Sequence, residues 1–347
     1  MRPIRSLQWA RGFTVLLMAP VHTVLLYSLP AVRDSWLGRP LAFIAEGPGA
    51  QLFMLLMGIF FVLSKKETAT SVLQKAVCLL LLGYALNVLK FVIPWQLDGL
   101  PFGLQEQLQL PLGLEGMVQV FMTSDILHFA ALALLVLYAV SRLPQPGFYA
   151  CVLALLICFM APAGWDLHSA NPVWDYLLQL LGGQPPVVYF PLLPWLVYPL
   201  LGLAIGHFLK THPPYHLFGL LGMLGLFLLF TGTLLAPRYP VASFYRTYPA
   251  DTLYHIGIVF VWLAVWQWVA DHTPRNWFFR GLGYLSDHIT QVYIIQWVLI
   301  CWLLPLAGFQ RLNVWESLAV LPVTSFLTLF ISLVITAAGP KGIVIEA

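Results

Sequence analysis

Charged residues are scarce in this sequence. They make up 9% of the 347 residues, whereas a soluble globular domain carries about 25%. Hydrophobic residues make up 60%, and the mean hydropathy is +0.84. Several apolar runs reach the roughly 20 residues that a helix needs to cross a bilayer. This composition excludes an ordinary soluble domain and predicts an all-α polytopic membrane protein, since runs such as LFGLLGMLGLFLLF lack the alternation of a transmembrane β-barrel.

Cysteine and net charge are low as well. The four cysteines fall within apolar segments, at spacings that match neither a disulfide framework nor a metal site, so we expect buried thiols and no bound metal. A net charge of +3 is too small to indicate a nucleic-acid partner. Glycine-rich phosphate loops and the G-x-S-x-G nucleophile elbow are absent too, which argues against the enzyme classes that depend on them.

The apolar runs predict about ten spanning helices within one domain over residues 1–347. The first run lacks a small-residue cleavage site, so we interpret it as a retained helix and not as a removed signal peptide. Two long connections, 94–121 and 164–186, mix Trp, Leu, Gln, Gly and Pro and are expected to lie against the membrane surface. The ten expected spans are 12–31, 47–64, 72–93, 122–141, 147–163, 187–209, 215–235, 252–270, 281–304 and 315–337.

Lysine and arginine predict the orientation in the membrane, because cytoplasmic loops carry an excess of both. With the N-terminus inside, the inner side holds eleven of them and the outer side six, so both termini are predicted to be cytoplasmic. The short loops suit a bacterial inner membrane. The inner set is Arg2, Arg5, Arg11, Lys65, Lys66, Lys75, Arg142, Lys210, Arg275, Arg280 and Lys341, and the outer set is Arg33, Arg39, Lys90, Arg238, Arg246 and Arg311.

The first span carries an arginine and a histidine, Arg11 and His22, with ten residues between them. At about 100° per residue the two return to nearly the same helix face, roughly 16 Å apart along the axis. An ionisable group at the depth of His22 is costly and is by default a functional hypothesis. The alternatives are a core histidine bonded to a neighbouring helix and an ordinary positive-inside anchor at Arg11.

This pair suits an acyl-CoA, which has phosphates at one end and a thioester at the other. A guanidinium at the cytoplasmic rim can bind phosphate through two parallel hydrogen bonds. A buried neutral imidazole can take the proton of a hydroxyl or amine that attacks the thioester. Arg11 is therefore the candidate ligand of the co-substrate acetyl-CoA, and His22 is the candidate general base.

Five stretches of the chain resemble, in order, the membrane acyltransferase superfamily that includes the type 3 acyltransferases, and most closely its branch of heparan-alpha-glucosaminide N-acetyltransferase-like proteins. The resemblance implies transfer of an acyl group from cytoplasmic acyl-CoA to a carbohydrate or glycolipid at the outer face. The sequence departs from the family pattern at Gln8, Ala250, Asp251 and Gln296. The matching stretches are SLQWARGF with the Arg-X10-His spacing, SDILHFAALALL, FPLLPWLVYPLLGLAIG, RTYPADTLYHIG and LGYLSDHITQVYIIQW.

Asp125 and His128 lie three residues apart at the start of the fourth expected span, so they share one helix face. One interpretation is a catalytic pair in which the carboxylate orients the imidazole. The alternative is a helix N-cap formed by Ser124 or Asp125, with His128 as an interfacial residue. Asp287 and His288 on the ninth span are candidates for binding CoA, or else a cap and a surface histidine.

Substrate binding is assigned to residues near the outer ends of the sixth and eighth spans. A tryptophan there could stack on a sugar ring, although belt tryptophans are common at this depth. The polar residues of the eighth span could instead form a solvated loop with one buried histidine. The candidates are Trp195, Arg246, Tyr248, Asp251 and His255.

Two other classes of function stay open. A transporter or flippase would also place ionisable groups within the membrane, although the inverted symmetry typical of transporters is not visible. A catalytically silent scaffold would tolerate the departures at Gln8 and Gln296. Membrane lipids are expected partners in every case, and self-association of the chain stays open.

Overall fold

The computed structural model describes residues 4–64, 67–241 and 243–338. In this part of the chain nine helices are long and apolar enough to cross a membrane, and a tenth apolar helix, Ile126–Ser141, has 16 residues. Each overlaps one predicted span, which confirms the all-α polytopic membrane fold. Arg2, Lys65, Lys66 and Lys341, which contributed to the predicted orientation, lie outside the described residues, and the orientation stays a prediction.

The chain folds into two compact units, each assembled from distant parts of the sequence. The first comprises residues 1–7, 50–83 and 123–273, and the second comprises residues 8–49, 84–122 and 274–347. Helices that pack together within one unit are therefore often separated by more than one hundred residues, as α1 and α16 are in the second unit.

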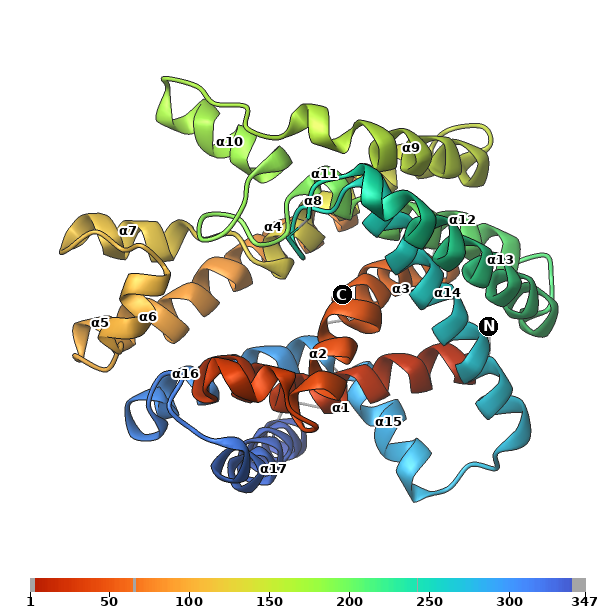
Figure 1. Ribbon diagram of the computed structural model, residues 1–347. Coiled ribbons are helices and arrows are strands. Elements are labelled where there is room, and N and C mark those ends of the chain that lie inside the picture. Colours follow the sequence, from red (N-terminus) through yellow and green to blue (C-terminus); the bar gives the residue numbers. More distant parts are fainter. Residues whose placement is uncertain (1–3, 65–66, 242, 339–347) are drawn as a thin grey trace. The chain divides into compact units, whose positions relative to one another are not determined.

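Helix packing in the first unit depends on small residues that allow backbones to approach closely. Gly58 of α3 lies against the carbonyl of Pro199 on α12, and Gly202 of α12 lies against the carbonyl of Leu55, so a Cβ at either glycine would collide with backbone. α13 and α14 lie side by side along much of their length (Figure 1). The helices of this unit are α3 (Ala50–Leu63), α4 (Ala69–Asn87, up to Gly83), α8 (Ile126–Ser141), α9 (Pro146–Met160), α10 (Pro172–Gly182), α11 (Leu192–Trp195), α12 (Val197–Leu209), α13 (Pro214–Leu235) and α14 (Pro249–His272), with short 3-10 turns at Ala161–Gly164 and Ala236–Arg238.

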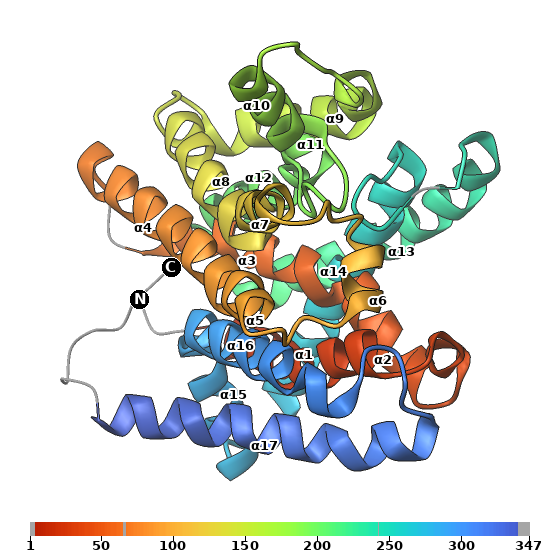
Figure 2. The ribbon, with the colours of Figure 1, turned by 90° about the vertical axis from the view of Figure 1, so that its left-hand side faces the viewer.

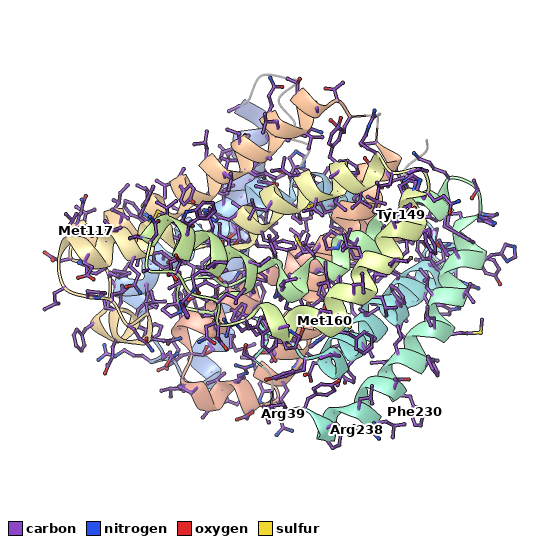
Figure 3. The ribbon with its side chains drawn as sticks, turned by 90° about the horizontal axis from the view of Figure 1, so that it is seen from above. Arg39, Met117, Tyr149, Met160, Phe230 and Arg238 are labelled. Carbon is purple, nitrogen blue, oxygen red and sulfur yellow. The ribbon has the colours of Figure 1, made fainter. Side chains whose placement is uncertain are left out.

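Large apolar side chains project outward from several of these helices. Tyr149 and Met160 stand at the two ends of α9, and Phe230 stands on α13 (Figure 3). All three are exposed. A contiguous apolar surface of this kind would be unfavourable in water and is expected of helices that face lipid.

The second unit is built around α1, which is tied to two C-terminal helices by hydrogen bonds. The hydroxyl of Tyr27 donates to the carbonyl of Ile300 at 2.7 Å, and Thr23 donates to Thr324 at 2.9 Å. α16 lies beside α17 (Figure 2). The elements of this unit are α1 (Arg5–Tyr27, from Gln8), a 3-10 turn (Pro30–Asp34), α2 (Gly38–Ile44), the π-helix η2 (Ala45–Gly49), the π-helix η3 (Val88–Val92), α5 (Ile93–Gln96), α6 (Phe102–Gln107), α7 (Leu114–Met122), α15 (Trp277–Asp287), α16 (Ile289–Ala307) and α17 (Val314–Ala338).

Three predicted boundaries differ from the structure. The expected span 281–304 is broken at His288, whose φ of −114° and ψ of 23° depart from helical values, and its ring nitrogen Nδ1 bonds the carbonyl of Tyr284 at 2.9 Å. The first helix begins at Arg5 and not at residue 12, so Arg11 lies well inside it. The connection 94–121 contains α5, α6 and α7, and the connection 164–186 contains α10.

Candidate active site

Arg11 is held by the end of α15. Its Nε donates to the hydroxyl of Ser286 at 2.7 Å, and its Nη2 lies 4.0 Å from a carboxylate oxygen of Asp287. The next residue, Gly12, packs against the carbonyl of Leu282, where a Cβ would collide, and this close approach brings Arg11 to α15. The Arg11 side chain is 15% exposed and that of Asp287 is 53% exposed. The structure thus joins two of the residues proposed to bind CoA.

His288, the third of those residues, makes different contacts. Its ring stacks on Tyr284 with centroids 4.2 Å apart, and its Nδ1 bonds the carbonyl of the same residue. The contacts described for His288 therefore stay within its own segment of chain and secure the break between α15 and α16.

His22 lies on α1 two residues after Pro20, eleven positions beyond Arg11. Its imidazole packs against the indole of Trp297 from α16 in a tilted arrangement, with ring centroids 4.3 Å apart and an interplanar angle of 32°. Its Nδ1 atom is fully buried. The candidate base is consequently a half-buried ring fixed by an aromatic neighbour, not a side chain that rotates freely.

Two residues near His22 were missed by the sequence analysis. Trp297 was part of an expected span without an assigned role, and Lys90 was counted among the outer-surface charges. The structure buries Lys90, with 3% of its surface exposed, and places its Nζ 5.0 Å from the centroid of the Trp297 ring. The available signal was a lysine followed by the apolar residues FVIPW, with no neighbouring acid.

Asp125 and His128 form a capping box at the start of α8. The Asp125 carboxylate accepts from the backbone N–H of Ile126 at 2.7 Å, and His128 Nδ1 accepts from the backbone N–H of Asp125 at 3.1 Å. Burial, together with the charge of Asp125, raises the pKa of Tyr189 to about 12. The structure therefore shows the helix cap. Because Nδ1 of His128 accepts a hydrogen bond, the proton of the neutral ring is on Nε2.

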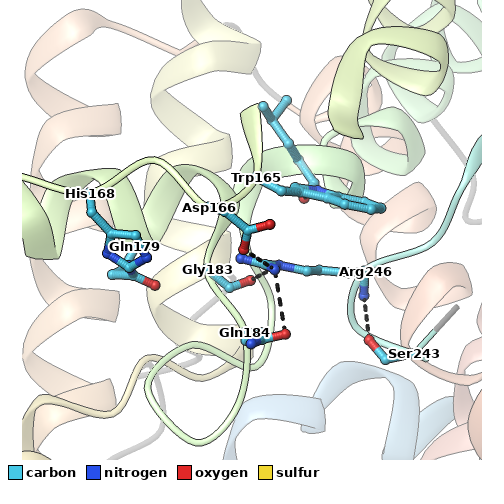
Figure 4. Close-up of polar contacts among 9 residues, drawn as sticks. Trp165, Asp166, His168, Gln179, Gly183, Gln184, Ser243 and Arg246 are labelled. Atoms are coloured by element: carbon cyan, nitrogen blue, oxygen red, sulfur yellow. Dashed lines mark hydrogen bonds and ion pairs between the residues drawn. The ribbon is translucent and has the colours of Figure 1, made fainter. Parts of the chain in front are cut away.

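Arg246 ties two loops of the first unit together (Figure 4). Its Nε donates to the carbonyl of Gly183 at 3.0 Å, and its Nη1 donates to Asp166 at 2.8 Å and to the side-chain oxygen of Gln184 at 3.4 Å. The guanidinium also lies over the Trp165 ring, 5.6 Å from its centroid. Most of its hydrogen-bonding capacity is used by the protein, so its observed role is to position the residues around it.

Trp195 is a buried residue in this structure, with 2% of its surface exposed. Its indole N–H donates to the carbonyl of Tyr245 at 2.9 Å. Its ring packs on Phe190 with centroids 4.7 Å apart and on Phe244 with centroids 5.4 Å apart. Because aromatic side chains cover its ring, Trp195 could stack on a sugar only after these neighbours moved.

Tyr248 is better placed to meet a ligand than Trp195. It is half-buried and contacts Trp165 at a centroid distance of 5.0 Å and Tyr239 at 5.6 Å. Asp251 and His255 follow one turn apart on α14, where both are half-buried. Tyr248, Trp165 and Tyr239, together with Arg246, form an aromatic platform, and we use this name for these four residues below.

Comparison with known proteins identifies the family. The family model described as "Heparan-alpha-glucosaminide N-acetyltransferase, catalytic" matches residues 4–222. The matched region contains Arg11, His22 and Lys90 and ends before the helix that carries Trp297. No curated protein and no solved structure shows significant similarity to the chain.

Proposed function

The chain belongs to the heparan-alpha-glucosaminide N-acetyltransferase catalytic family, and on this premise we propose that it moves an acetyl group from acetyl-CoA to a carbohydrate, with His22 as the general base. A membrane acetyltransferase activity in general follows from the family. The donor, the base and the choice between a hydroxyl and an amine acceptor are parts of the proposal.

The observation that carries the proposal is the placement of Arg11 and His22 on one helix. Polar side chains contact Arg11, and an aromatic ring contacts His22. Arg11 contacts Ser286 and Asp287 near the start of α1, and His22 packs against Trp297 near its other end. Eleven helical positions span about 16 Å, a length that suits the pantetheine arm between the phosphates and the thioester of CoA.

The donor end of the site would hold acetyl-CoA through the Arg11 guanidinium. The guanidinium donates to Ser286 and lies 4.0 Å from Asp287, and a planar guanidinium of this kind can bind a phosphate oxygen through charge-assisted hydrogen bonds. Asp287 is about half exposed, so it can exchange its ion pair for solvent when a phosphate arrives at Arg11.

The transfer requires one proton acceptor and no covalent intermediate. The oxygen or nitrogen of the acceptor attacks the thioester carbonyl carbon while the imidazole of His22 takes its proton. The tetrahedral intermediate then expels the CoA thiolate by breaking the carbon–sulfur bond, and the imidazolium returns the proton to that sulfur. The contact with the Trp297 ring restricts the motion of the imidazole, which supports the proposal because a base that serves two proton transfers must be held in position.

We propose that the aromatic platform of the first unit binds carbohydrate, independently of the contacts made by Arg11 and His22. Partly exposed aromatic rings can stack on the apolar faces of sugars, and Asp166 adds an exposed carboxylate for their hydroxyls. Asp251 and His255 are retained as proposed acceptor contacts on the adjacent helix. We do not assign the capping pair Asp125 and His128 a chemical step, because their described hydrogen bonds serve the helix.

The experiment is acetyl transfer by the purified protein in detergent. Radiolabelled acetyl-CoA is supplied with glucosamine as the amine probe or methyl α-D-glucopyranoside as the hydroxyl probe, and labelled sugar and released thiol are both measured. The proposal expects binding of acetyl-CoA and product with at least one probe. If the protein neither binds acetyl-CoA nor cleaves its thioester, a transport role is the better explanation of the buried ionisable groups.

A further inference from the structure

Lys90 occupies an unusual position for a lysine. It lies in η3, the one-turn π-helix that joins α4 to α5 within the apolar stretch Ala69–Gln96, and 3% of its surface is exposed. A lysine is almost never this deeply buried unless its charge is used, and a charge within a spanning segment is a functional hypothesis by default.

The Lys90 ammonium shares an aromatic neighbour with His22. Its Nζ lies 5.0 Å from the centroid of the Trp297 ring and 4.9 Å from that of Phe91. The imidazole of His22 lies 4.3 Å from the same Trp297 ring. One indole thus supports both the proposed base and a buried cation, and all three residues belong to the second unit.

The backbone around Lys90 is anchored firmly. The indole N–H of Trp302 donates to the carbonyl of Leu89 at 2.8 Å, and the side chain of Asn87 donates to the carbonyl of Phe121 at 2.9 Å. A π-helix shifts the helical register by one residue and often occurs at functional sites. Lys90 lies within this π-helical turn with its Nζ near the Trp297 ring, and the hydrogen bond from Trp302 of α16 anchors the same turn.

A second observation on α16 indicates that a polar ligand belongs beside Trp297. The side chain of Gln296 is 0% exposed, and within the described part of the chain neither of its polar atoms has a hydrogen-bond partner. The same holds for the buried indole nitrogen of Trp297. Leaving such a group unpaired costs about 1–3 kcal/mol, so the unpaired indole N–H of Trp297 favours a polar ligand atom at this ring.

We propose that Lys90 is a further catalytic residue, which stabilises the oxyanion formed on the acetyl carbonyl. This inference rests on the proposed function. As the acceptor bonds to the carbonyl carbon and His22 takes its proton, the carbonyl electron pair moves onto oxygen. The Lys90 ammonium neutralises that charge, and the indole N–H of Trp297 is an available second donor. The charge disappears when the carbonyl re-forms and the thiolate leaves.

This assignment gives the buried cation beside Trp297 a role in catalysis. An oxyanion site stabilises charge that exists only in the transition state, and its donors act most strongly where water is excluded. The acetyl-CoA ground state has a neutral carbonyl, so loss of Lys90 should change the rate of transfer much more than the affinity for the donor.

The test compares Lys90→Met with Lys90→Arg and with Lys75→Met. Lys75 is a matched control on α4, where its ammonium pairs with Glu67 at 2.7 Å. We expect Lys90→Met to lower kcat for acetyl transfer to glucosamine or methyl α-D-glucopyranoside by about 10²–10³-fold. Its Kd for acetyl-CoA should stay within threefold of wild type, Lys90→Arg should recover at least tenfold over the methionine variant, and Lys75→Met should match wild type.

The outcomes separate this inference from the proposed function. Suppose that Lys90→Met has a kcat within threefold of wild type in an assay where His22→Ala is inactive. This result overturns the role proposed for Lys90 and leaves the proposed function standing. A wild-type protein that does not use acetyl-CoA overturns both. If Lys90→Met fails to fold, as measured by its thermal unfolding, the neutral Lys90→Gln is compared with Lys90→Arg, and equal kcat values for these two overturn the inference.

Discussion

The imidazole of His22 and the indole of Trp297 pack together at a centroid distance of 4.3 Å and an interplanar angle of 32°, although they are 275 positions apart in the sequence. This contact joins α1 to α16 in the second unit. It gives the proposed base a fixed orientation and also brings the base near Lys90, which lies over the same indole. The predictions below follow from this contact and from the polar contacts of Arg11, Asp125 and Asp175.

Replacing Trp297 should impair catalysis while leaving donor binding intact. Trp297→Leu removes the ring that orients His22, and a small misplacement of a catalytic group can lower the rate by about 10²-fold. We expect kcat to fall by about 10–100-fold, and we expect Trp297→Phe, which keeps a ring against His22 but lacks the indole N–H, to recover only part of this loss. Trp268→Leu is the control, because Trp268 stacks on His272 at 5.0 Å on an exposed part of α14. Equal losses at both tryptophans would contradict the account.

Removing the hydroxyl of Ser286 should weaken binding of acetyl-CoA. Hydrogen bonds to charged groups contribute about 1.5–3 kcal/mol, and Ser286→Ala leaves Arg11 without its fixed acceptor. We expect Kd for acetyl-CoA to rise about tenfold with kcat nearly unchanged, measured by equilibrium binding of labelled donor. Ser325→Ala is the control, since that hydroxyl bonds only the carbonyl of Leu321 in its own helix among its described partners. An unchanged Kd in Ser286→Ala would argue against donor binding at Arg11.

The pair Asp125 and His128 should behave as a structural cap. Asp125→Ala removes a side-chain cap, and such losses cost about 0.5–2 kcal/mol of stability. We expect a lower unfolding temperature and a kcat within threefold of wild type, measured on the same preparation. A kcat that falls by more than tenfold without a change in stability would return the pair to the catalytic machinery.

The loop before α10 should loosen in acid. The backbone N–H of Ser169 and the side chain of His168 both bond Asp175 and hold the pKa of that carboxyl below its usual range. A carboxyl with a depressed pKa in the folded state contributes stability above its unfolded pKa, and this contribution is lost as the pH falls through the folded pKa. The difference in unfolding temperature between wild type and Asp175→Asn should therefore be present at pH 7 and shrink as the pH falls below the ordinary pKa of an aspartate. A difference that is constant with pH would contradict this linkage.

The sequence predicted the helices well because long apolar runs have few alternatives in a membrane. It assigned Arg11 and Asp287 separately as candidates for binding CoA, and the structure places their side chains 4.0 Å apart. It also included the cap at Asp125 as one of two interpretations. Periodicity alone could not show the π-helix at Val88–Val92, because a one-residue register shift leaves an apolar run apolar. The burial of Lys90 was missed because the ring that covers its ammonium belongs to Trp297 of α16, about two hundred residues later in the chain.

The substrate residues show what packing adds to the sequence. Trp195 and Arg246 were predicted to face a ligand because aromatic and basic residues gather there in sequence. In the structure Trp195 is covered by Phe190 and Phe244, and Arg246 is engaged by Asp166 and Gly183. Composition indicates where polar and aromatic side chains gather. Only the packing shows which of them already bond or contact one another and so are not available to a ligand.

The most direct test of the account is the rate of acetyl transfer by His22→Ala. With saturating acetyl-CoA and a sugar probe, general-base catalysis contributes about 10²–10⁴-fold to the rate. The account predicts a loss of at least 10²-fold with normal acetyl-CoA binding, while His216→Ala, an exposed histidine at the start of α13, retains wild-type activity. A His22→Ala protein that transfers acetyl groups within threefold of the wild-type rate would contradict it.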